Sequence, residues 1–132
     1  MTNIPESHRY LLNDETKAFA FLATVMPNDS PQVTPVWFNV DGDFILVNSA
    51  KGRVKDRNMR SKGEVALAIA DPKNPYRYMQ IRGVVLEITE EGGRDHINQL
   101  NFKYHGSTSY GGPANETRVI YRIRPVSVST MG

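Results

Sequence analysis

Six of the twelve residues from Lys51 to Lys62 are basic, and only Asp56 among them is acidic. The rest of the chain holds ten basic and thirteen acidic residues, so the formal net charge of +2 divides into +5 for this segment and −3 for the remainder. A concentrated positive charge attracts polyanions, namely phosphates, oligocarboxylates or nucleic acid. A charge run is also typical of a solvated helix face, and the segment by itself leaves both interpretations open.

The spacing of the basic residues predicts two helical faces. Arg53, Arg57 and Arg60 recur at i, i+4 and i+7, and a second face carries Lys51, Lys55, Asn58 and Lys62. Val54 and Met59 are the only sizeable apolar side chains of the segment. A helix with so little apolar surface has no broad buried stripe, so its charge is expected to face solvent or a ligand.

A second candidate for chemistry is the apolar run from Gln32 to Val40, which contains Pro35 near its middle. Proline donates no hydrogen bond to a β-ladder, so this run is expected to be an edge strand or to be bulged there. An interrupted ladder leaves peptide groups of Thr34, Val36 and Trp37 free to bind a flat ligand with polar edges. Protection of the edge against aggregation explains Pro35 equally well from this run alone.

Other kinds of site are not indicated. The chain has no cysteine, which excludes thiol catalysis and zinc–thiolate sites. His8, His96 and His105 stand in separate segments without metal-binding spacing, so no metal site is predicted. The carboxylate pairs Asp14–Glu15 and Glu90–Glu91 lie at expected element ends, where capping and solubility explain them. No nucleophile–base pair is recognised in the sequence and no catalytic residue is assigned. An enzyme of this sequence would therefore rely on the reactive atom of a bound cofactor.

The length of 132 residues predicts one domain spanning residues 1–132, since domains commonly hold ~100–200 residues. No apolar run approaches the ~20 residues of a membrane span. The first residues, Met1 to Glu6, lack the basic and apolar regions of a signal peptide, and a cytoplasmic protein is expected.

The pattern along the chain predicts mainly antiparallel strands. A short helix is expected from Pro5 to about Leu12, followed by a hairpin of Ala18–Met26 and Gln32–Val40 around a proline-rich turn. Asp41-Gly42-Asp43 is a second hairpin turn, leading into the strand Phe44–Ser49. The basic helix follows.

The C-terminal half continues with a strand at Glu64–Ala70 and a long strand, Tyr76–Glu90, bent at Gly83. A helix is expected from Glu90 to Tyr104, a mobile loop at Ser107–Asn115, and a last strand from Arg118 to Val128. This order predicts a mainly β fold, a six-stranded antiparallel β-barrel with short helices at its ends.

Four stretches together resemble the split β-barrel flavin and deazaflavin proteins, the pyridoxamine 5′-phosphate oxidase-like superfamily, and within it the branch of F420-dependent oxidoreductases. They are Ala23–Met26, Pro31–Phe38, Asn48–Asn58 and Asp71–Tyr78. The resemblance extends from about Pro5 to Val128, and "PQVTPVWF" with "AKGRVKDRN" at this separation is its most specific part. It implies an FMN-binding split-barrel type of fold, a homodimer, and a cofactor groove between the two subunits.

The resemblance also implies where the cofactor, coenzyme F420 or alternatively FMN, would bind. The ring system would lie along the strand around Pro35, its phosphate would meet Arg53 and Lys55, and Tyr78 and Gln80 would come from the partner subunit. Lys51 and Arg57 are second choices for the acidic tail of F420. The full set of implied cofactor-binding residues is Gln32, Thr34, Pro35, Val36, Trp37, Asn48, Ser49, Ala50, Lys51, Arg53, Lys55, Asn58, Tyr78 and Gln80.

The implied reaction is hydride transfer from reduced F420 to an electron-poor conjugated acceptor such as a quinone, an enone or a tetrapyrrole-like molecule. Motifs of authentic pyridoxamine phosphate oxidases that bind FMN phosphate and pyridoxal phosphate are not evident, so that activity is not expected. An FMN-binding oxidoreductase of the same fold, a non-catalytic F420 or flavin carrier, and a nucleic-acid binder remain alternatives. Against the last, the chain outside the basic segment is net acidic.

Overall fold

A computed structural model describes residues 4–132 of the chain. The expectation that the N-terminus is not a signal peptide rests partly on residues 1–3, which lie outside this range. The described chain begins with two short 3₁₀ helices, η1 (Glu6–Leu12) and η2 (Asp14–Thr16). The helix expected to start at Pro5 begins one residue later, because Pro5 has an extended ψ of 140° and stands before η1 as its N-cap residue.

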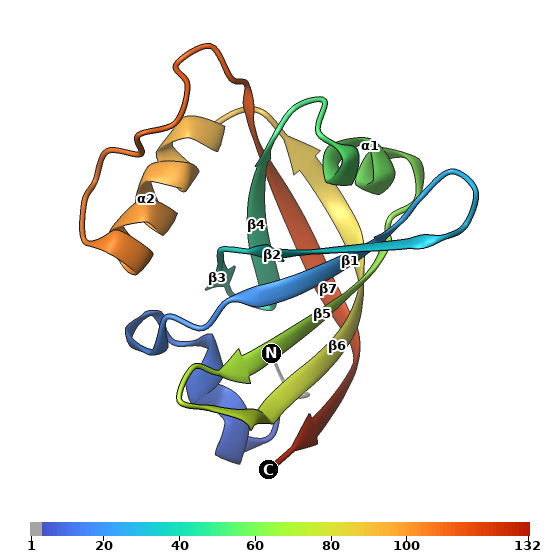
Figure 1. The fold of residues 1–132 in the computed structure, drawn as a ribbon, viewed down its shortest axis with the longest axis vertical. Coiled ribbons are helices and arrows are strands. Elements are labelled where there is room, and N and C mark those ends of the chain that lie inside the picture. The colour runs from blue at the N-terminus through green and yellow to red at the C-terminus, as the bar shows by residue number, and fades with distance from the viewer. Residues whose placement is uncertain (1–3) are drawn as a thin grey trace.

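Seven strands follow and form one antiparallel sheet: β1 (Ala20–Val25), β2 (Pro31–Val36), β3 (Phe38–Asp41), β4 (Phe44–Ala50), β5 (Glu64–Asp71), β6 (Asn74–Thr89) and β7 (Arg118–Met131). Their order across the sheet is β2-β1-β5-β6-β7-β4-β3. The sheet curls strongly, with the long strands β6 and β7 running through its middle (Figure 1). The mainly β antiparallel architecture expected from the sequence is confirmed.

The sheet has seven strands rather than six because the predicted strand Gln32–Val40 divides at Trp37. Val36 pairs with Ala20 of β1, whereas Phe38 pairs with Val47 of β4. One residue thus carries the chain from one edge of the sheet to the other, and the ladder cannot continue when the partner strand changes. Two side chains of the second α-helix satisfy the backbone of Phe38 there: the hydroxyl of Tyr104 accepts from its amide at 3.3 Å and Lys103 donates to its carbonyl at 2.7 Å.

The expected edge position of Pro35 is confirmed. Within residues 4–132, β2 pairs only with β1, and Pro35 stands opposite Phe21 in that pairing. The bend expected at Gly83 is also present as a register shift between Arg82 and Gly83. An added Cβ on Gly83 would lie 2.8 Å from the carbonyl oxygen of Arg124, so the close approach of β7 requires glycine.

The core follows the two-residue alternation of the strands. On β5 and β6 the inward side chains are buried, while Ala68, Gln80 and Arg82 face outward. The largest fully buried side chains come from all the long strands and from the helices: Tyr121, Phe38, Leu11, Leu22, Ile45, Met59, Leu67, Ile69, Met79, Ile81, Leu100 and Ile123.

Two α-helices flank one end of the sheet and the 3₁₀ helices cover the other (Figure 1). The basic segment forms α1 (Val54–Ser61), and α2 (Gly93–His105) precedes the long loop to β7. At the opposite end, His8 Nε2 donates to the carbonyl of Met131 at 2.8 Å, which ties η1 to the last strand.

Candidate functional site

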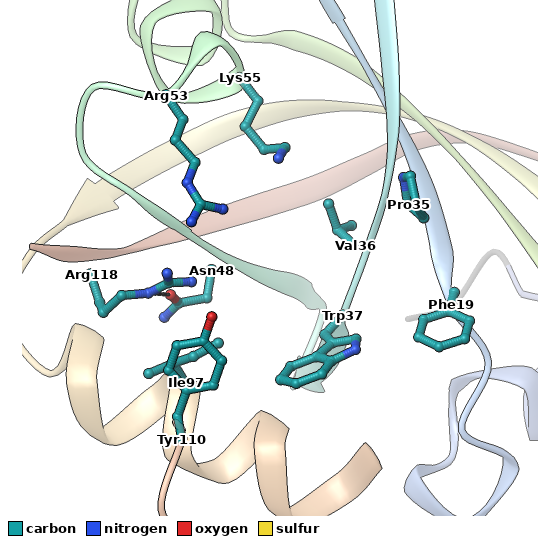
Figure 2. A pocket seen from close by; sticks show the side chains of 10 residues that line it. All are labelled: Phe19, Pro35, Val36, Trp37, Asn48, Arg53, Lys55, Ile97, Tyr110 and Arg118. Carbon is teal, nitrogen blue, oxygen red and sulfur yellow. Dashed lines mark hydrogen bonds between the residues drawn. The ribbon is translucent and has the colours of Figure 1, made fainter. Parts of the chain in front are cut away.

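A cavity of about 390 Å³ opens between the β2–β3 junction, α1 and α2. Figure 2 shows its walls: Trp37 at the centre, Arg53 and Lys55 directed into it from one side, and Tyr110 below. Its lining residues are Phe19, Pro35, Val36, Trp37, Asn48, Arg53, Lys55, Ile97, Tyr110 and Arg118. The cavity thus combines an apolar and aromatic floor with three cationic side chains.

The three cations converge on one wall. Burial lowers the pKa of the half-buried Lys55, and the neighbouring charges of Arg53 and Arg118 lower it further, so the three groups repel one another. The ammonium group of Lys55 has no hydrogen-bond or ion-pair partner among residues 4–132. Glu116 offsets part of the charge: its Oε2 accepts from Arg118 at 2.8 Å, and its Oε1 lies 3.5 Å from Arg53. The wall therefore keeps a positive surplus suited to an anion.

The single acid of the basic segment positions this wall. Asp56 is buried and accepts from the Gly52 amide at 2.8 Å, from Arg60 at 2.9 Å and from the Tyr121 hydroxyl. Burial raises the pKa of Asp56, but these hydrogen bonds and the charge of Arg60 outweigh it, so the pKa lies below its usual range. The carboxylate thereby holds the turn before α1 in place. Arg53 is the N-cap residue of α1, and Lys55 lies in the first turn of that helix.

Arg118 is held by a buried polar chain. Its Nε donates to Asn48 Oδ1 at 2.8 Å, the amide of Asn48 donates to His96 Nδ1 at 3.0 Å, and His96 Nε2 lies 2.9 Å from Asn39 Oδ1. This network assigns the ring proton of His96 to Nε2, because Asn48 occupies Nδ1 as a donor. Burial, with the charges of Arg118 and Arg122, lowers the pKa of His96 to about 4. His96 is therefore neutral near pH 7.

Stacked aromatic rings form the floor of the cavity. Tyr104 stacks on Phe19 at 5.3 Å and on Trp37 at 5.2 Å between ring centroids. The Tyr104 hydroxyl donates to the carbonyl of Ala18 at 2.6 Å, so the stack is anchored to the segment just before β1. Tyr110 meets Trp37 edge-on, and its ring lies 5.2 Å from the guanidinium of Arg118. These contacts offer a planar ligand a rigid aromatic surface beside the cations.

The structure brings six of the fourteen residues implied by the resemblance into this cavity. They are Pro35, Val36, Trp37, Asn48, Arg53 and Lys55. Two neighbours on β4 do not line it: Ser49 is buried with its hydroxyl unpartnered among the described residues, and Ala50 accepts from the Arg53 amide through its carbonyl at 3.2 Å. Lys51 points elsewhere and pairs with Glu90 at 2.9 Å.

Three more of the implied residues belong to the hairpin and its contact with α1. The hydroxyl of Thr24 donates to Gln32 at 2.9 Å and accepts from Asn58 at 3.0 Å, so Gln32 and Asn58 bond within the fold rather than in the cavity. Thr34 has a buried hydroxyl without a partner among residues 4–132. Contacts of these residues with a cofactor remain predictions.

The last two implied residues, Tyr78 and Gln80, lie on the outer face of β6. Gln80 stands opposite Ala68 of β5 and is exposed, while Tyr78 stands opposite Ala70 and is partly buried. Neither lines the cavity within one subunit. Their assignment to the cofactor therefore depends on a second subunit.

Sequence reasoning missed four lining residues and Glu116. These lining residues come from the segment just before β1, from α2, from the loop after it and from β7: Phe19, Ile97, Tyr110 and Arg118. The predicted loop Ser107–Asn115 carries Tyr110, whose amide donates to Asn98 of α2 at 2.9 Å. The sequence did contain an indication for Arg118, because an arginine at the first position of an apolar strand is rarely buried unless it is paired.

Two other features of residues 4–132 bear on the class of protein. No helix there is long and apolar enough to cross a membrane. No group of three or more His, Cys, Asp or Glu side chains in this range is arranged to hold a metal ion.

Comparisons with known proteins agree with the fold. A family model described as pyridoxamine 5′-phosphate oxidase matches residues 4–132. A solved structure described as an F420 reductase is 35% identical, with a TM-score of 0.84, over 96% of this chain and 98% of that chain. Curated proteins give no match.

More distant structures share the fold. A conserved hypothetical protein from Mycobacterium tuberculosis is 21% identical, with a TM-score of 0.72, over 97% of this chain and 84% of its own. General Stress Protein 26 from Bacillus anthracis is 16% identical, with a TM-score of 0.69, over 96% and 92%.

Proposed function

Because this chain belongs to the pyridoxamine 5′-phosphate oxidase family of split β-barrel proteins, we propose that it is an oxidoreductase that uses coenzyme F420. The observation that carries the proposal is the unpartnered, half-buried Lys55 beside Arg53 and Arg118, on the wall of a cavity whose floor is aromatic. The 35% identity to a protein described as an F420 reductase supports F420 over other anionic ligands.

The residues present fit a phosphate joined to a planar ring. Arg53 and Lys55 would hold the phosphate, because charge-assisted hydrogen bonds to Arg and Lys are the strong ones. Trp37 and the edge strand at Pro35 would orient the ring, with Val36 closing the floor. Arg118 would hold its place through Asn48 and add a third positive charge at the same wall.

When bound, a reduced 5-deazaflavin supplies a hydride, and we propose an electron-poor conjugated small molecule, such as a quinone, an enone or a tetrapyrrole-like compound, as the acceptor. His96, behind the lining cations, is neutral near pH 7 and has both ring nitrogens hydrogen-bonded, and no lining side chain is assigned as the proton donor. The accompanying proton would therefore come from solvent.

The proposal includes a homodimer with a cofactor site at each interface. The outer face of the sheet beside the cavity supports it, because Phe21, Ala68 and Gln80 stand in one cross-strand row on β1, β5 and β6. Phe21 is 46% exposed, and small alanines next to it permit close approach of another sheet. Packing of two such faces would bring the partner's copies of Tyr78 and Gln80 toward the ring. A cytoplasmic location also remains part of the proposal.

An FMN-binding oxidoreductase is the second candidate, because FMN offers a phosphate and a similar ring edge to the same cavity. The deciding experiment is fluorescence titration of the purified protein with F420 and with FMN in parallel. F420 is expected to bind saturably and more tightly than FMN. Tighter binding of FMN would move the proposal to the flavin, and binding of neither would overturn it.

Turnover separates an enzyme from a carrier. Stopped-flow mixing of the protein and reduced F420 with a panel of quinones and enones should show oxidation of F420 above the uncatalysed rate. Tight F420 binding without oxidation by any member of the panel would favour a carrier.

A further inference from the structure

Glu116 is the acidic side chain at the cationic wall of the cavity. Its carboxylate lies between two of the lining cations, 2.8 Å from Arg118 and 3.5 Å from Arg53. The side chain is only 15% exposed. Three lining cations and one carboxylate leave this wall with a formal charge of +2, because Arg53, Lys55 and Arg118 each contribute one positive charge.

The position of Glu116 is built into the fold. Arg94 of α2 donates to the backbone carbonyls of Glu116 at 3.2 Å and of Pro113 at 3.3 Å. The Glu116 amide donates in turn to the Pro113 carbonyl at 3.4 Å. The loop before β7 is thereby fastened to the helix at the residue that carries the carboxylate.

We propose that Glu116 is a specificity-determining residue, which makes the cavity favour a singly charged phosphodiester over a doubly charged phosphomonoester. This inference rests on the proposed function, because it assumes that the phosphate of the cofactor meets Arg53 and Lys55. It goes further in naming a residue that separates F420, a phosphodiester, from FMN, a phosphomonoester.

The physical reason is the dependence of Coulomb energy on ligand charge. A carboxylate beside the phosphate repels a charge of −2 twice as strongly as a charge of −1. A phosphomonoester carries about −1.5 to −2 at pH 7, because its second ionisation has a pKa of about 6. This repulsion is strongest where the charged groups are removed from water. The side chains of Arg118 and Glu116 are only 4% and 15% exposed, so the repulsion should be strong at this wall.

An acid is not needed merely to place Arg118, because Asn48 already orients its guanidinium. The guanidinium of Arg53, by contrast, has Glu116 as its ion-pair partner. Glu116 therefore adds negative charge beside a cation that has a second anchor. Lys55, which Glu116 does not contact, keeps enough positive charge to bind one anionic group.

The test compares Glu116→Gln with Glu116→Asp, which keeps the charge, and with Glu87→Gln as the matched control. Glu87 pairs with Arg122 at 3.5 Å outside the cavity, so its loss removes the same charge from a different place. Circular dichroism and thermal unfolding check that each variant folds. The ligands are F420, FMN and the monomethyl phosphate ester of FMN, and fluorescence titration at pH 8 gives each dissociation constant.

In Glu116→Gln, the ratio of the dissociation constant of FMN to that of its methyl ester should fall about tenfold. This is the effect of removing one unit charge from a partly screened protein site. The same variant should narrow the preference for F420 over FMN, whereas Glu116→Asp and Glu87→Gln should leave both ratios within about twofold of the unmodified protein.

An unchanged ratio between FMN and its ester in Glu116→Gln would overturn the inference, and so would failure of that variant to bind FMN at all, because the ring would then decide the choice of cofactor. If F420 binds in either case, the proposed function survives. If the unmodified protein binds none of the three ligands, the proposed function fails first.

Discussion

His96 illustrates what burial does to a single side chain in this fold. It lies behind the cationic wall, 4% exposed, with both ring nitrogens hydrogen-bonded to asparagines. A protonated ring would have to break the bond from Asn48 and would sit near the charges of Arg118 and Arg122. The side chain thus orients the binding residues and is unsuited to proton transfer.

Stability should therefore depend on pH through His96. Its pKa is about 4 in the folded protein and 6.5 as the ordinary value, so the unfolded chain binds the proton more readily. The free energy of unfolding should be largest above pH 6.5 and should fall as the pH drops toward 4, by on the order of 3 kcal/mol at about 1.4 kcal/mol per unit. Urea unfolding from pH 4 to 7.5 measures this slope.

The variant His96→Gln should be less stable at pH 7.5 but should lose most of that slope. A slope that persists unchanged in this variant would rule out His96 as the source of the pH dependence. Below pH 4 the carboxylates take over, because the pKa of Asp56 lies below its usual range.

Cofactor affinity is the second property that single residues should control. Replacing Arg53 or Lys55 by alanine should weaken F420 binding by about 1.5–3 kcal/mol each, the worth of a charge-assisted hydrogen bond. Arg124→Ala is the control, since Arg124 is an exposed cation on β7 that does not line the cavity. Equal weakening by all three variants would indicate general electrostatic attraction rather than a defined phosphate site.

At the scale of elements, the cavity depends on the close packing of α2 against β4 and β7, the strands that supply Asn48 and Arg118. The first residue of α2 is Gly93, whose carbonyl accepts from Asn48 at 3.0 Å. A Cβ added to Gly93 would lie 2.1 Å from the backbone carbonyl oxygen of Arg118. This clash can be relieved only if α2 moves away from β7. The same approach positions the buried chain from Arg118 to His96.

Gly93→Ala should thus act on stability and binding together. Overpacking of this kind costs about 1–3 kcal/mol, and displacement of α2 should also weaken F420 binding. Gly111→Ala in the following loop is the control, because an added Cβ there meets nothing within 4 Å. Thermal unfolding and F420 titration check both effects. A variant as stable as the control would mean that α2 and β7 are less tightly coupled than the structure indicates.

At the scale of the molecule, one sheet forms the whole scaffold, and its two edges meet through a single residue, Trp37. The chain passes from β2 to β3 there, so one residue connects the two edge strands at the point where the β-ladder is interrupted. The same junction supplies the aromatic floor of the cavity. The outer face of β1, β5 and β6 continues from this junction, which places the proposed dimer interface next to the proposed cofactor site.

The proposed dimer predicts that a charge on this face dissociates the subunits. Ala68→Glu should give a monomer in analytical ultracentrifugation at micromolar concentration and should also reduce F420 affinity, because Tyr78 and Gln80 of the partner would be lost. Phe102→Glu, at a 58% exposed position of α2, is the control for an added surface charge. A monomeric unmodified protein with full F420 affinity would contradict the dimer and the roles assigned to Tyr78 and Gln80.

Neighbouring residues along the chain determined much of what could be predicted. Alternation predicted the strands, Pro35 predicted an edge strand, and the charge of Lys51–Lys62 indicated a candidate anion site, because each depends on local geometry. The resemblance then implied that Arg53 and Lys55 bind a phosphate and that Trp37 contacts a ring. Six of the fourteen implied residues lie together in the cavity.

Only the tertiary structure brought Arg118, Tyr110 and Glu116 to the same place as residues some sixty positions earlier. Arg118 reaches Asn48 because β7 pairs with β4, and α2 with its loop packs over that pairing. Such contacts depend on which strands become neighbours in the curled sheet, and no short stretch of sequence encodes that choice. The sequence therefore predicted an anion site at the basic segment, while the packing of distant strands decided which other charges and which walls surround that segment.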